Sequence, residues 1–379
     1  MAKQLYTDDE LIEALERNGG NKAATARDLQ FDERTLRRRL KRLALKGYSP
    51  EHDMVHTVPD GFKVKGVSTY YNADGQPTGQ WVKSSADDER RYQMMLEAVE
   101  AMKEEVPRQD AISAPASSAE DLLNCYVITD YHFGQLSWGY ETRGEDYDLK
   151  IAEQQLVDWF AAAIASSPNS AVGVFAQVGD FLHYSGSGLQ ATTESSGHIL
   201  DADGRFQKLV RVVVRSVRRI INMLLEKHQS VHVLMCEGNH DTSASVWLRE
   251  MLYAMYEDEP RITVDRSADP YYVYEFGDVS LYFHHGHKQK VSSIAQVFVS
   301  KFREIFGRTR HSFAHMGHLH HVDVKEGNLM VVEQHRTLAA SDAHSSRGGW
   351  QSGRDAKVIT YHKRFGEVGR ITINSDMLK

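Results

Sequence analysis

Five short stretches of this sequence share one pattern, in which an apolar run ends and side chains of metal-binding types follow at once. In the central stretch, residues 231–236 predict a buried strand, and residues 238–241 continue as Gly-Asn-His-Asp. The other four stretches follow their own predicted strands and cover residues 130–132, 179–183, 284–287 and 317–321. In open α/β sheets, sites are built at the edge where strands end. The pattern therefore constrains the chain to a fold that gathers these strand ends.

The Asn-His-Asp triplet is poor material for a hydrophobic core and good material for a metal site. Asn239 offers an oxygen and His240 an imidazole, while Asp241 can orient that imidazole. Gly238 lets the backbone turn sharply and lets neighbouring groups approach closely.

The chain from residue 122 onward predicts an α/β domain. Amphipathic helices are expected over residues 151–166, 206–228 and 245–257, between the strands that carry the motifs. The second half of the domain is predicted to be mostly strands. This alternation favours an α/β sheet layered against a second sheet and flanked by helices.

Composition narrows the class of protein. With 379 residues, the chain has room for two or three domains, and 41% hydrophobic and 26% charged residues are typical of a soluble protein. Cys125 and Cys236 lie inside predicted strands and are expected to be buried thiols, which suits a reducing cytoplasm. We see no signal peptide and no run near the ~20 apolar residues of a membrane span, so a cytoplasmic location is expected.

The N-terminal residues 1–48 predict a separate basic module. They hold eleven Lys/Arg and eight Asp/Glu, a net charge of +3. Because the whole chain has a net charge of −7, the remainder carries −10. Thr7 or Asp8, Asn21 and Asp32 can cap three short helices, which together predict a helix-turn-helix. The third helix carries the cations Arg34, Arg37, Arg38, Arg39, Lys41 and Arg42. A charged, solvated helix without a partner is the alternative.

This segment resembles the Fis-type DNA-binding module. The matching residues are Gly-Asn-Lys at 20–22, the paired Ala23 and Ala24, and Thr-Leu-Arg at 35–37, whereas Gln30 stands where that family usually has a turn glycine. The resemblance implies that the six cations bind DNA, and it points to a bacterial or bacteriophage protein in a bacterial cell or phage-infected host. Helix-turn-helix proteins bind in pairs, which suggests a homodimer.

Between the two modules, residues 49–106 predict a connector and residues 107–121 a linker. Two strands are expected over residues 62–71 and 80–83, joined by a turn at 72–75 and followed by a helix over 87–105. The expected domains are therefore 1–48, 49–106 and 122–379.

The five motif stretches together resemble the calcineurin-like metallophosphoesterases, whose pattern is Asp-x-His, Gly-Asp, Gly-Asn-His-Asp/Glu, a later His and Gly-His-x-His. The resemblance implies a four-layer α/β/β/α sandwich and two divalent metal ions, Mn²⁺ first, with Fe or Zn²⁺ as alternatives. One metal would be held by Asp130, His132 and His320, the other by Asn239, His285 and His318, with Asp180 bridging them.

The resemblance also implies a mechanism, in which a metal-bridging hydroxide attacks the phosphorus and His240, oriented by Asp241, assists the leaving group. In the fourth motif the family pattern selects His285, and strand alternation would turn His284 to the opposite face. His287 is left as an outer neighbour or an exposed residue. His315 is expected to be a hydrogen-bonded core residue.

His183 follows Asp180 at the spacing of a phosphate-contacting histidine in the nuclease branch, and the arginine of the protein phosphatases is absent here. Arg336 and Arg347 are candidate substrate contacts, with ordinary surface arginines as the alternative. The sequence therefore predicts a two-metal phosphodiesterase acting on DNA as a nuclease. The alternatives are a small-substrate phosphatase or cyclic-nucleotide phosphodiesterase with a regulatory DNA-binding module, and a DNA-binding regulator.

Overall fold

The computed structural model describes residues 6–30, 32–45, 48–49, 54–55, 62–71, 77–86, 93, 112–186, 191–194 and 196–379. The chain divides into two compact units, one ending at Met94 and the other comprising nearly all of the remainder. Each unit is described by itself.

The first unit begins with three short helices, α1 (Asp8–Arg17), α2 (Lys22–Asp28) and α3 (Glu33–Leu45). Thr7 caps α1 in a capping box with Glu10, and Asn21 caps α2 by accepting from two backbone amides. Asp32 accepts from the Thr35 amide at the start of α3. The helices close on a small apolar core of Leu11, Ala14, Ala26, Leu29, Leu36 and Leu43. The expected three-helix module is confirmed.

The connector forms strands where the described residues allow a comparison. β3 (Phe62–Tyr71) pairs antiparallel with β4 (Pro77–Ala86), and β1 (Tyr48–Ser49) pairs with β2 (Met54–Val55). The two long strands confirm the predicted hairpin, although β4 is longer than expected. The predicted turn and almost all of the helix over 87–105 lie outside the described residues.

The second unit is built on two sheets. The six-stranded sheet runs in the order β15 (Gly366–Asn374), β14 (Asp355–His362), β5 (Ala119–Ile128), β6 (Ser170–Gln177), β7 (Ser230–Met235), β8 (Ile262–Val264). The five-stranded sheet runs in the order β12 (Asp323–Glu326), β13 (Val331–Gln334), β11 (His311–Met316), β10 (Val279–Phe283), β9 (Tyr272–Phe276).

Alternation along the strands sends side chains to two different cores. Leu123, Cys125 and Val127 of β5 meet residues such as Leu281 and Phe283 of β10, so one core lies between the two sheets. Tyr126 and Ile128 of β5 face the opposite way, into a core made with helices. Both cysteines are free and buried, as expected.

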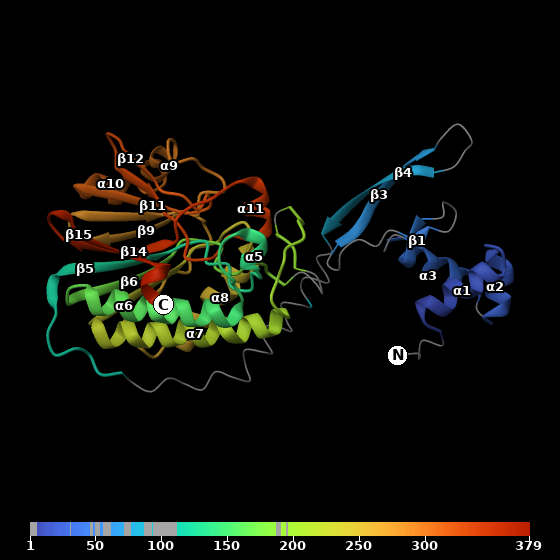
Figure 1. Cartoon of the computed structure of the whole chain (residues 1–379), viewed down its shortest axis with the longest axis horizontal. Coiled ribbons are helices and arrows are strands. Elements are labelled where there is room, and N and C mark those ends of the chain that lie inside the picture. Colours follow the sequence, from blue (N-terminus) through green and yellow to red (C-terminus); the bar gives the residue numbers. More distant parts are fainter. Residues whose placement is uncertain are drawn as a thin grey trace. The chain divides into compact units, whose positions relative to one another are not determined.

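Helices cover the outer face of each sheet. The six-stranded sheet packs on α6 (Leu149–Ser166), α7 (Phe206–Lys227) and α8 (Thr242–Met255). Residues of α9 (Ile294–Lys301) close a third core on the five-stranded sheet, beside α10 (Arg303–Arg308). Figure 1 draws α6 and α7 on one outer side of the two sheets and α9 and α10 on the other, which is the order that the resemblance implies.

Several elements escaped the sequence analysis. They are α5 (Gly139–Thr142), α9, α10, α11 (Ala343–Gly348), the 3-10 helix η2 (Ser375–Leu378) and the short strands β8 and β12. Most of these elements are too short to show the periodic spacing of apolar residues by which helices and strands are predicted.

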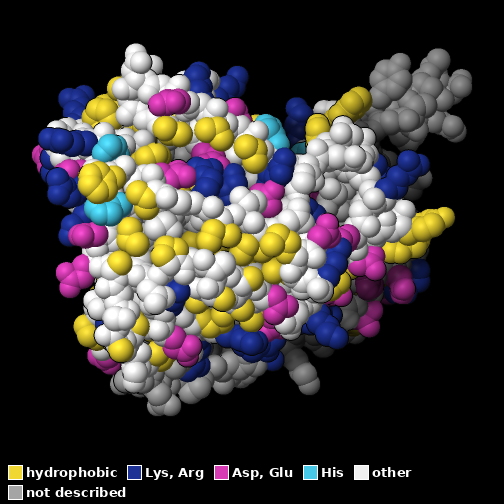
Figure 2. All heavy atoms as spheres, turned by 60° about the vertical axis from the view of Figure 1, so that its left-hand side comes forward, with side chains coloured by type: hydrophobic (Ala, Val, Ile, Leu, Met, Phe, Trp, Pro, Cys, Tyr) yellow, Lys and Arg dark blue, Asp and Glu magenta, His cyan; other side chains and the backbone are white. Residues whose placement is uncertain are grey.

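The strand directions place the motifs at the carboxyl ends of parallel strands in both sheets. β5, β6 and β7 are parallel neighbours, and so are β10 and β11. Asp130, Asp180 and Asn239 follow the carboxyl ends of the first three strands, and His285 and His318 follow those of the other two. The face drawn in Figure 2 intersperses basic, acidic and apolar side chains. Among the described residues, no helix is long and apolar enough to cross a membrane.

The buried imidazole of His228 makes the stability of the second unit depend on pH. It hydrogen-bonds the Tyr126 hydroxyl at 3.0 Å and Ser170, and burial lowers its pKa to about 4. The neutral ring is therefore stabilising above the unfolded-state pKa of 6.5, and this contribution is lost as pH falls toward 4. We expect the difference in free energy of unfolding between wild type and His228→Gln to shrink by up to about 3 kcal/mol between pH 6.5 and 4. Denaturant unfolding at several pH values checks this, and a difference that stays constant would contradict it.

Candidate functional site

The first predicted metal trio comes together in the structure. Ligand atoms of Asp130, His132 and His320 all lie within 4.8 Å of one another. The His320 Nε2 atom is 3.1 Å from Asp130 Oδ1. Asp130 and His132 are buried, whereas His320 is partly exposed and leaves one side open to solvent. Two imidazoles and one carboxylate form a donor set suited to Mn²⁺, Fe or Zn²⁺.

A second trio lies beside the first and joins the predicted bridging residue Asp180 to two of the three residues predicted for the other metal. Ligand atoms of Asp180, His285 and His318 all lie within 4.8 Å of one another, and His285 Nε2 is 3.0 Å from Asp180 Oδ2. The Asn239 side-chain oxygen is 3.2 Å from the same nitrogen, and Asp130 Oδ1 is 3.8 Å from it. All seven residues predicted as metal ligands thus converge.

The backbone at these positions is strained. Among the described residues, seven non-glycine residues have positive φ, and five of them belong to this set. These five are Asp130, His132, Asp180, His318 and His320, with φ between 50° and 78°. Positive φ costs free energy in residues that carry a Cβ, and such strain clusters at functional sites. The surrounding sandwich therefore holds these side chains in orientations that a relaxed strand end would not give.

Glycines in the motifs allow the ligands to approach the backbone. A Cβ added at Gly238 would overlap the Asp180 carboxylate, and one at Gly317 would overlap Thr129 and Asp130. One at Gly179, which also has a φ of +93°, would overlap the His285 ring. The motif glycines are thus explained by close packing against the ligands.

The electrostatics of the site call for positive charge. Burial raises the pKa values of the Asp130 and Asp180 carboxyls, but the neighbouring imidazoles, His320 and His285 first among them, hold both below the ordinary value. Burial works in the opposite sense on His285, and the two carboxylates overcome it and raise the pKa of His285 to about 10. Two buried carboxylates therefore share a protonated imidazole, and divalent ions would supply that charge on loading. The residues fit a binuclear metal centre.

Asp130 is held by groups that the sequence analysis missed. The Thr129 hydroxyl donates to Asp130 Oδ2 at 2.5 Å, and the His318 amide donates to the same carboxylate at 2.8 Å. The Thr337 hydroxyl donates to the Asp130 carbonyl at 2.5 Å. Threonine is common at strand ends, so no sequence signal indicated that Thr129 and Thr337 support a metal ligand.

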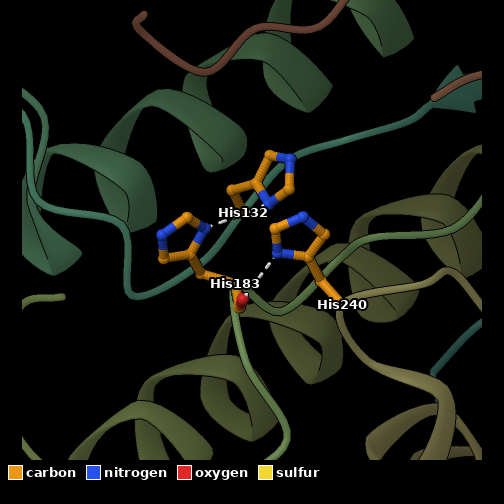
Figure 3. A group of neighbouring side chains, drawn as sticks. All are labelled: His132, His183 and His240. Atoms are coloured by element: carbon orange, nitrogen blue, oxygen red, sulfur yellow. Dashed lines mark hydrogen bonds between the residues drawn. The ribbon is translucent and has the colours of Figure 1, made fainter. Parts of the chain in front are cut away.

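A third group of histidines borders the first trio. The rings of His132, His183 and His240 lie close together in Figure 3, and their ligand atoms are within 4.8 Å of one another. His183 Nδ1 is 3.2 Å from His132 Nδ1, and His240 Nδ1 is 2.9 Å from the His183 carbonyl oxygen. Burial lowers the pKa of His183 to about 3, so its ring is neutral. His183 is 1% exposed and supports His240 through its carbonyl.

The prediction that Asp241 orients His240 is wrong. The Asp241 carboxylate accepts from the Phe181 and Leu182 amides at 2.8 and 3.0 Å and from the Gly238 amide at 3.0 Å. The chain turns into α8 at Asp241, so its side chain points back into the loop after β6. Asp241 therefore ties the motif after β7 to the motif after β6, and burial, with the charge of Asp180, raises its pKa to about 7.

The other histidines in and near the motifs have different surroundings from the predicted ligands. His284 stacks on Tyr271 at 4.5 Å, on the opposite side of the strand from His285, as expected. His287 stacks on His284 with ring centroids 5.5 Å apart. His315 is buried between the His335 ring and the Tyr361 hydroxyl, at 2.9 and 3.0 Å, which confirms its expected core role.

Both arginines predicted to contact substrate are held in ion pairs. Arg336 Nη1 is 2.8 Å from the buried carboxylate of Asp355. Arg347 Nη2 is 2.8 Å from Glu141, and its side chain is 79% exposed. Arg347 thus keeps most of its guanidinium open to solvent, whereas Arg336 has a structural partner.

The six cations of α3 also differ in their surroundings. Arg39 donates to the Asp8 carboxylate at 2.8 Å and to the Tyr6 carbonyl at 3.0 Å, and its side chain is only 14% exposed. Arg37 pairs with Glu33 one turn earlier. Arg34, Arg38 and Lys41 are exposed. Gln30 takes the left-handed conformation, with φ of 52°, at the position where the Fis pattern has glycine.

Comparison with known protein families gives one match, over residues 9–43, to the bacterial regulatory protein, Fis family. The N-terminal segment is a Fis-type helix-turn-helix. No curated protein matches the chain.

Solved structures that are similar to this chain include a predicted phosphoesterase from Streptococcus pneumoniae, at 11% identity over 68% of this chain and 99% of that one, with a TM-score of 0.27. An archaeal phosphodiesterase matches at 12% identity over 66% and 99%, with a TM-score of 0.34. Vps29 of Entamoeba histolytica complexed with Zn²⁺ matches at 10% identity over 66% and 99%, with a TM-score of 0.26. All three TM-scores are below 0.5, so these structures carry no argument about the site. Its interpretation depends on the strand order and the motif positions described above.

The two environments on α3 predict separate effects of two substitutions. Arg38→Ala should weaken duplex DNA binding and reduce the slope of log affinity against log salt by about 0.9, because one phosphate contact is lost. Arg39→Ala should instead destabilise the module by about 1–2 kcal/mol, because a charged hydrogen bond to Asp8 is lost. Salt titrations of binding and thermal unfolding separate the two effects. Equal effects of both variants on the salt slope would contradict the assignment.

The glycine packing predicts that Gly317→Ala disables the site. The new Cβ would displace Thr129 and the Asp130 carboxylate, so we expect metal affinity to fall about 10–100-fold, the usual effect of disturbing the groups that support a ligand. Gly327→Ala is the matched control, because its Cβ would meet only the Met330 carbonyl oxygen at 3.9 Å. Calorimetric titration with Mn²⁺ measures both, and equal affinities would contradict the packing argument.

Proposed function

We propose that this chain is a metal-dependent phosphodiesterase that hydrolyses DNA, with the helix-turn-helix bringing it to the polymer. The observation that carries the proposal is the meeting of the two donor trios around His285, whose Nε2 lies 3.0 Å from Asp180 and 3.8 Å from Asp130. When bound, two divalent ions neutralise phosphate charge and acidify a water. Asp130, His132 and His320 would hold one ion, Asn239, His285 and His318 the other, and Asp180 both.

His240 is the residue that we assign to proton transfer. Its Nδ1 lies 2.9 Å from the His183 carbonyl oxygen, and a carbonyl can only accept a hydrogen bond. Nδ1 therefore keeps its proton in either charge state, and Nε2 is the atom that gives or takes one. His240 is partly exposed, so a leaving oxygen can reach it. The His240 amide donates to Asp180 Oδ1 at 2.8 Å, which ties this residue to the carboxylate between the trios.

A DNA substrate is favoured by the joining of a Fis-type module to this site in one chain. The direct contact of His183 with a phosphate and the homodimer stay predictions. A small-substrate phosphatase or cyclic-nucleotide phosphodiesterase uses the same centre. Comparing phosphomonoester and phosphodiester chromogenic substrates separates these activities. A DNA-binding regulator without catalysis would keep its full biological effect in an Asp180→Asn variant.

The proposal predicts Mn²⁺-dependent cleavage of labelled DNA that depends on His240. We expect His240→Asn to lower the rate by about 10²–10⁴, because the proton-transferring group is lost. His321→Asn is the matched control, since the side chain of this exposed neighbour of the last motif hydrogen-bonds only the Leu319 carbonyl among the described residues. Chelation should abolish cleavage, and added Mn²⁺ should restore it. Rapid turnover of a small phosphodiester with no cleavage of single- or double-stranded DNA would refute the DNA substrate.

A further inference from the structure

We propose that exposed aromatic side chains on α5 and beside α11 form a stacking platform for single-stranded DNA at the rim of the metal centre. This inference rests on the proposed function and specifies the form of the substrate. We call the platform the aromatic rim and define it by Trp138, Tyr140, His344 and Trp350.

The rings of the aromatic rim are exposed and paired. Trp138 and Tyr140 are 62% and 84% exposed, and their ring centroids lie 5.1 Å apart at an interplanar angle of 33°. Trp350 is 63% exposed and lies 5.5 Å from the His344 ring. Large exposed aromatic rings that gather in one place are unusual on a surface without a binding role.

The backbone that carries the rings is held by contacts within the chain. Ser137 and Tyr147 exchange two backbone hydrogen bonds, and the Gly139 amide donates to Asp146 at 2.7 Å, so the segment that holds Trp138 and Tyr140 is closed on itself. A Cβ at Gly348 would lie 2.7 Å from the Trp350 ring, so this ring packs directly on the glycine. An ordered backbone reduces the conformational entropy that is lost when a base stacks on the rings.

The two halves of the aromatic rim are neighbours. The Ser346 hydroxyl of α11 donates to the Thr142 carbonyl of α5 at 3.4 Å, and Arg347 pairs with Glu141 at 2.8 Å. Figure 1 draws α5 and α11 side by side. The rings therefore belong to one surface.

This surface adjoins the metal centre. Trp138 follows His132 by six residues, which limits their separation to about 20 Å even in an extended chain. The intervening Gln135 donates to the Ala340 carbonyl at 2.6 Å, just before α11. A strand lying on the rings is thus within a few nucleotides of the site.

Two exposed arginines on the same segments as the rings can pair with phosphates. They are Arg143, which directly follows α5, and Arg347 of α11, which also pairs with Glu141. Aromatic rings that alternate with cations bind single strands, because bases stack on the rings while phosphates pair with the cations. A duplex cannot use these rings, since its base faces are already stacked.

The test is binding of a fluorescein-labelled oligothymidylate to the full chain in chelator, measured by anisotropy at physiological salt. We expect Trp138→Ala/Tyr140→Ala to weaken binding by roughly 5–150-fold, the effect of losing one stacked base. The matched control is Phe365→Ala, because this ring is 63% exposed, close to the 62% of Trp138, but follows β14 at the opposite end of the sheet from the metal centre. Duplex binding and the unfolding midpoint should be unchanged in both variants.

Unweakened oligothymidylate binding by the double variant, or equal losses in Phe365→Ala, would overturn the aromatic rim. Binding of oligouridylate alone would overturn its assignment to DNA. A parallel Mn²⁺ cleavage assay with wild type distinguishes the two proposals. Ring-dependent binding without cleavage would refute the nuclease activity and support the aromatic rim. Cleavage with ring-independent binding would support the nuclease activity and refute the aromatic rim.

Discussion

The burial of two carboxylates within reach of one imidazole is the constraint on which the catalytic unit depends. Asp130 and Asp180 are almost fully buried, and isolated buried charges are unstable unless they are paired and hydrogen-bonded. Here the compensation comes from His285, from the His318 and His240 amides and from Thr129. These groups follow four different strands, two from each sheet, so the charge pair can exist only when both sheets are assembled.

That dependence explains why the strain is concentrated where it is. Positive φ at residues such as Asp180 and His320 is maintained because the packed sandwich fixes both ends of each loop. Gly238 and Gly317 leave no side chain between neighbouring motifs, and Asp241 ties two loops together by accepting three backbone amides. Contacts within the chain therefore position the ligand side chains relative to one another.

The N-terminal module follows a different logic, in which local signals dominate. Its caps at Thr7, Asn21 and Asp32 act within one turn of their own helices, and each forms as the sequence predicts. Which of its cations are exposed is not a local property. Arg39 is mostly buried because it pairs with Asp8, which is far away in the chain. A count of arginines on a helix therefore overstates the number that are free to meet a phosphate.

The sequence by itself determined the order of the motifs, the strands that precede them and the types of donor that they offer, because apolar periodicity and residue chemistry are local properties. It also determined the helix-turn-helix, whose capping signals are local. Only the tertiary structure decided that Asp241 holds the loop after β6 instead of His240, that the His183 carbonyl fixes His240, and that Thr129 and Thr337 support Asp130. It alone brought α5 and α11 together as one surface. These contacts join residues from separate strands and loops, and which partner a polar group takes is set by the packing of two sheets, which no short stretch of sequence encodes.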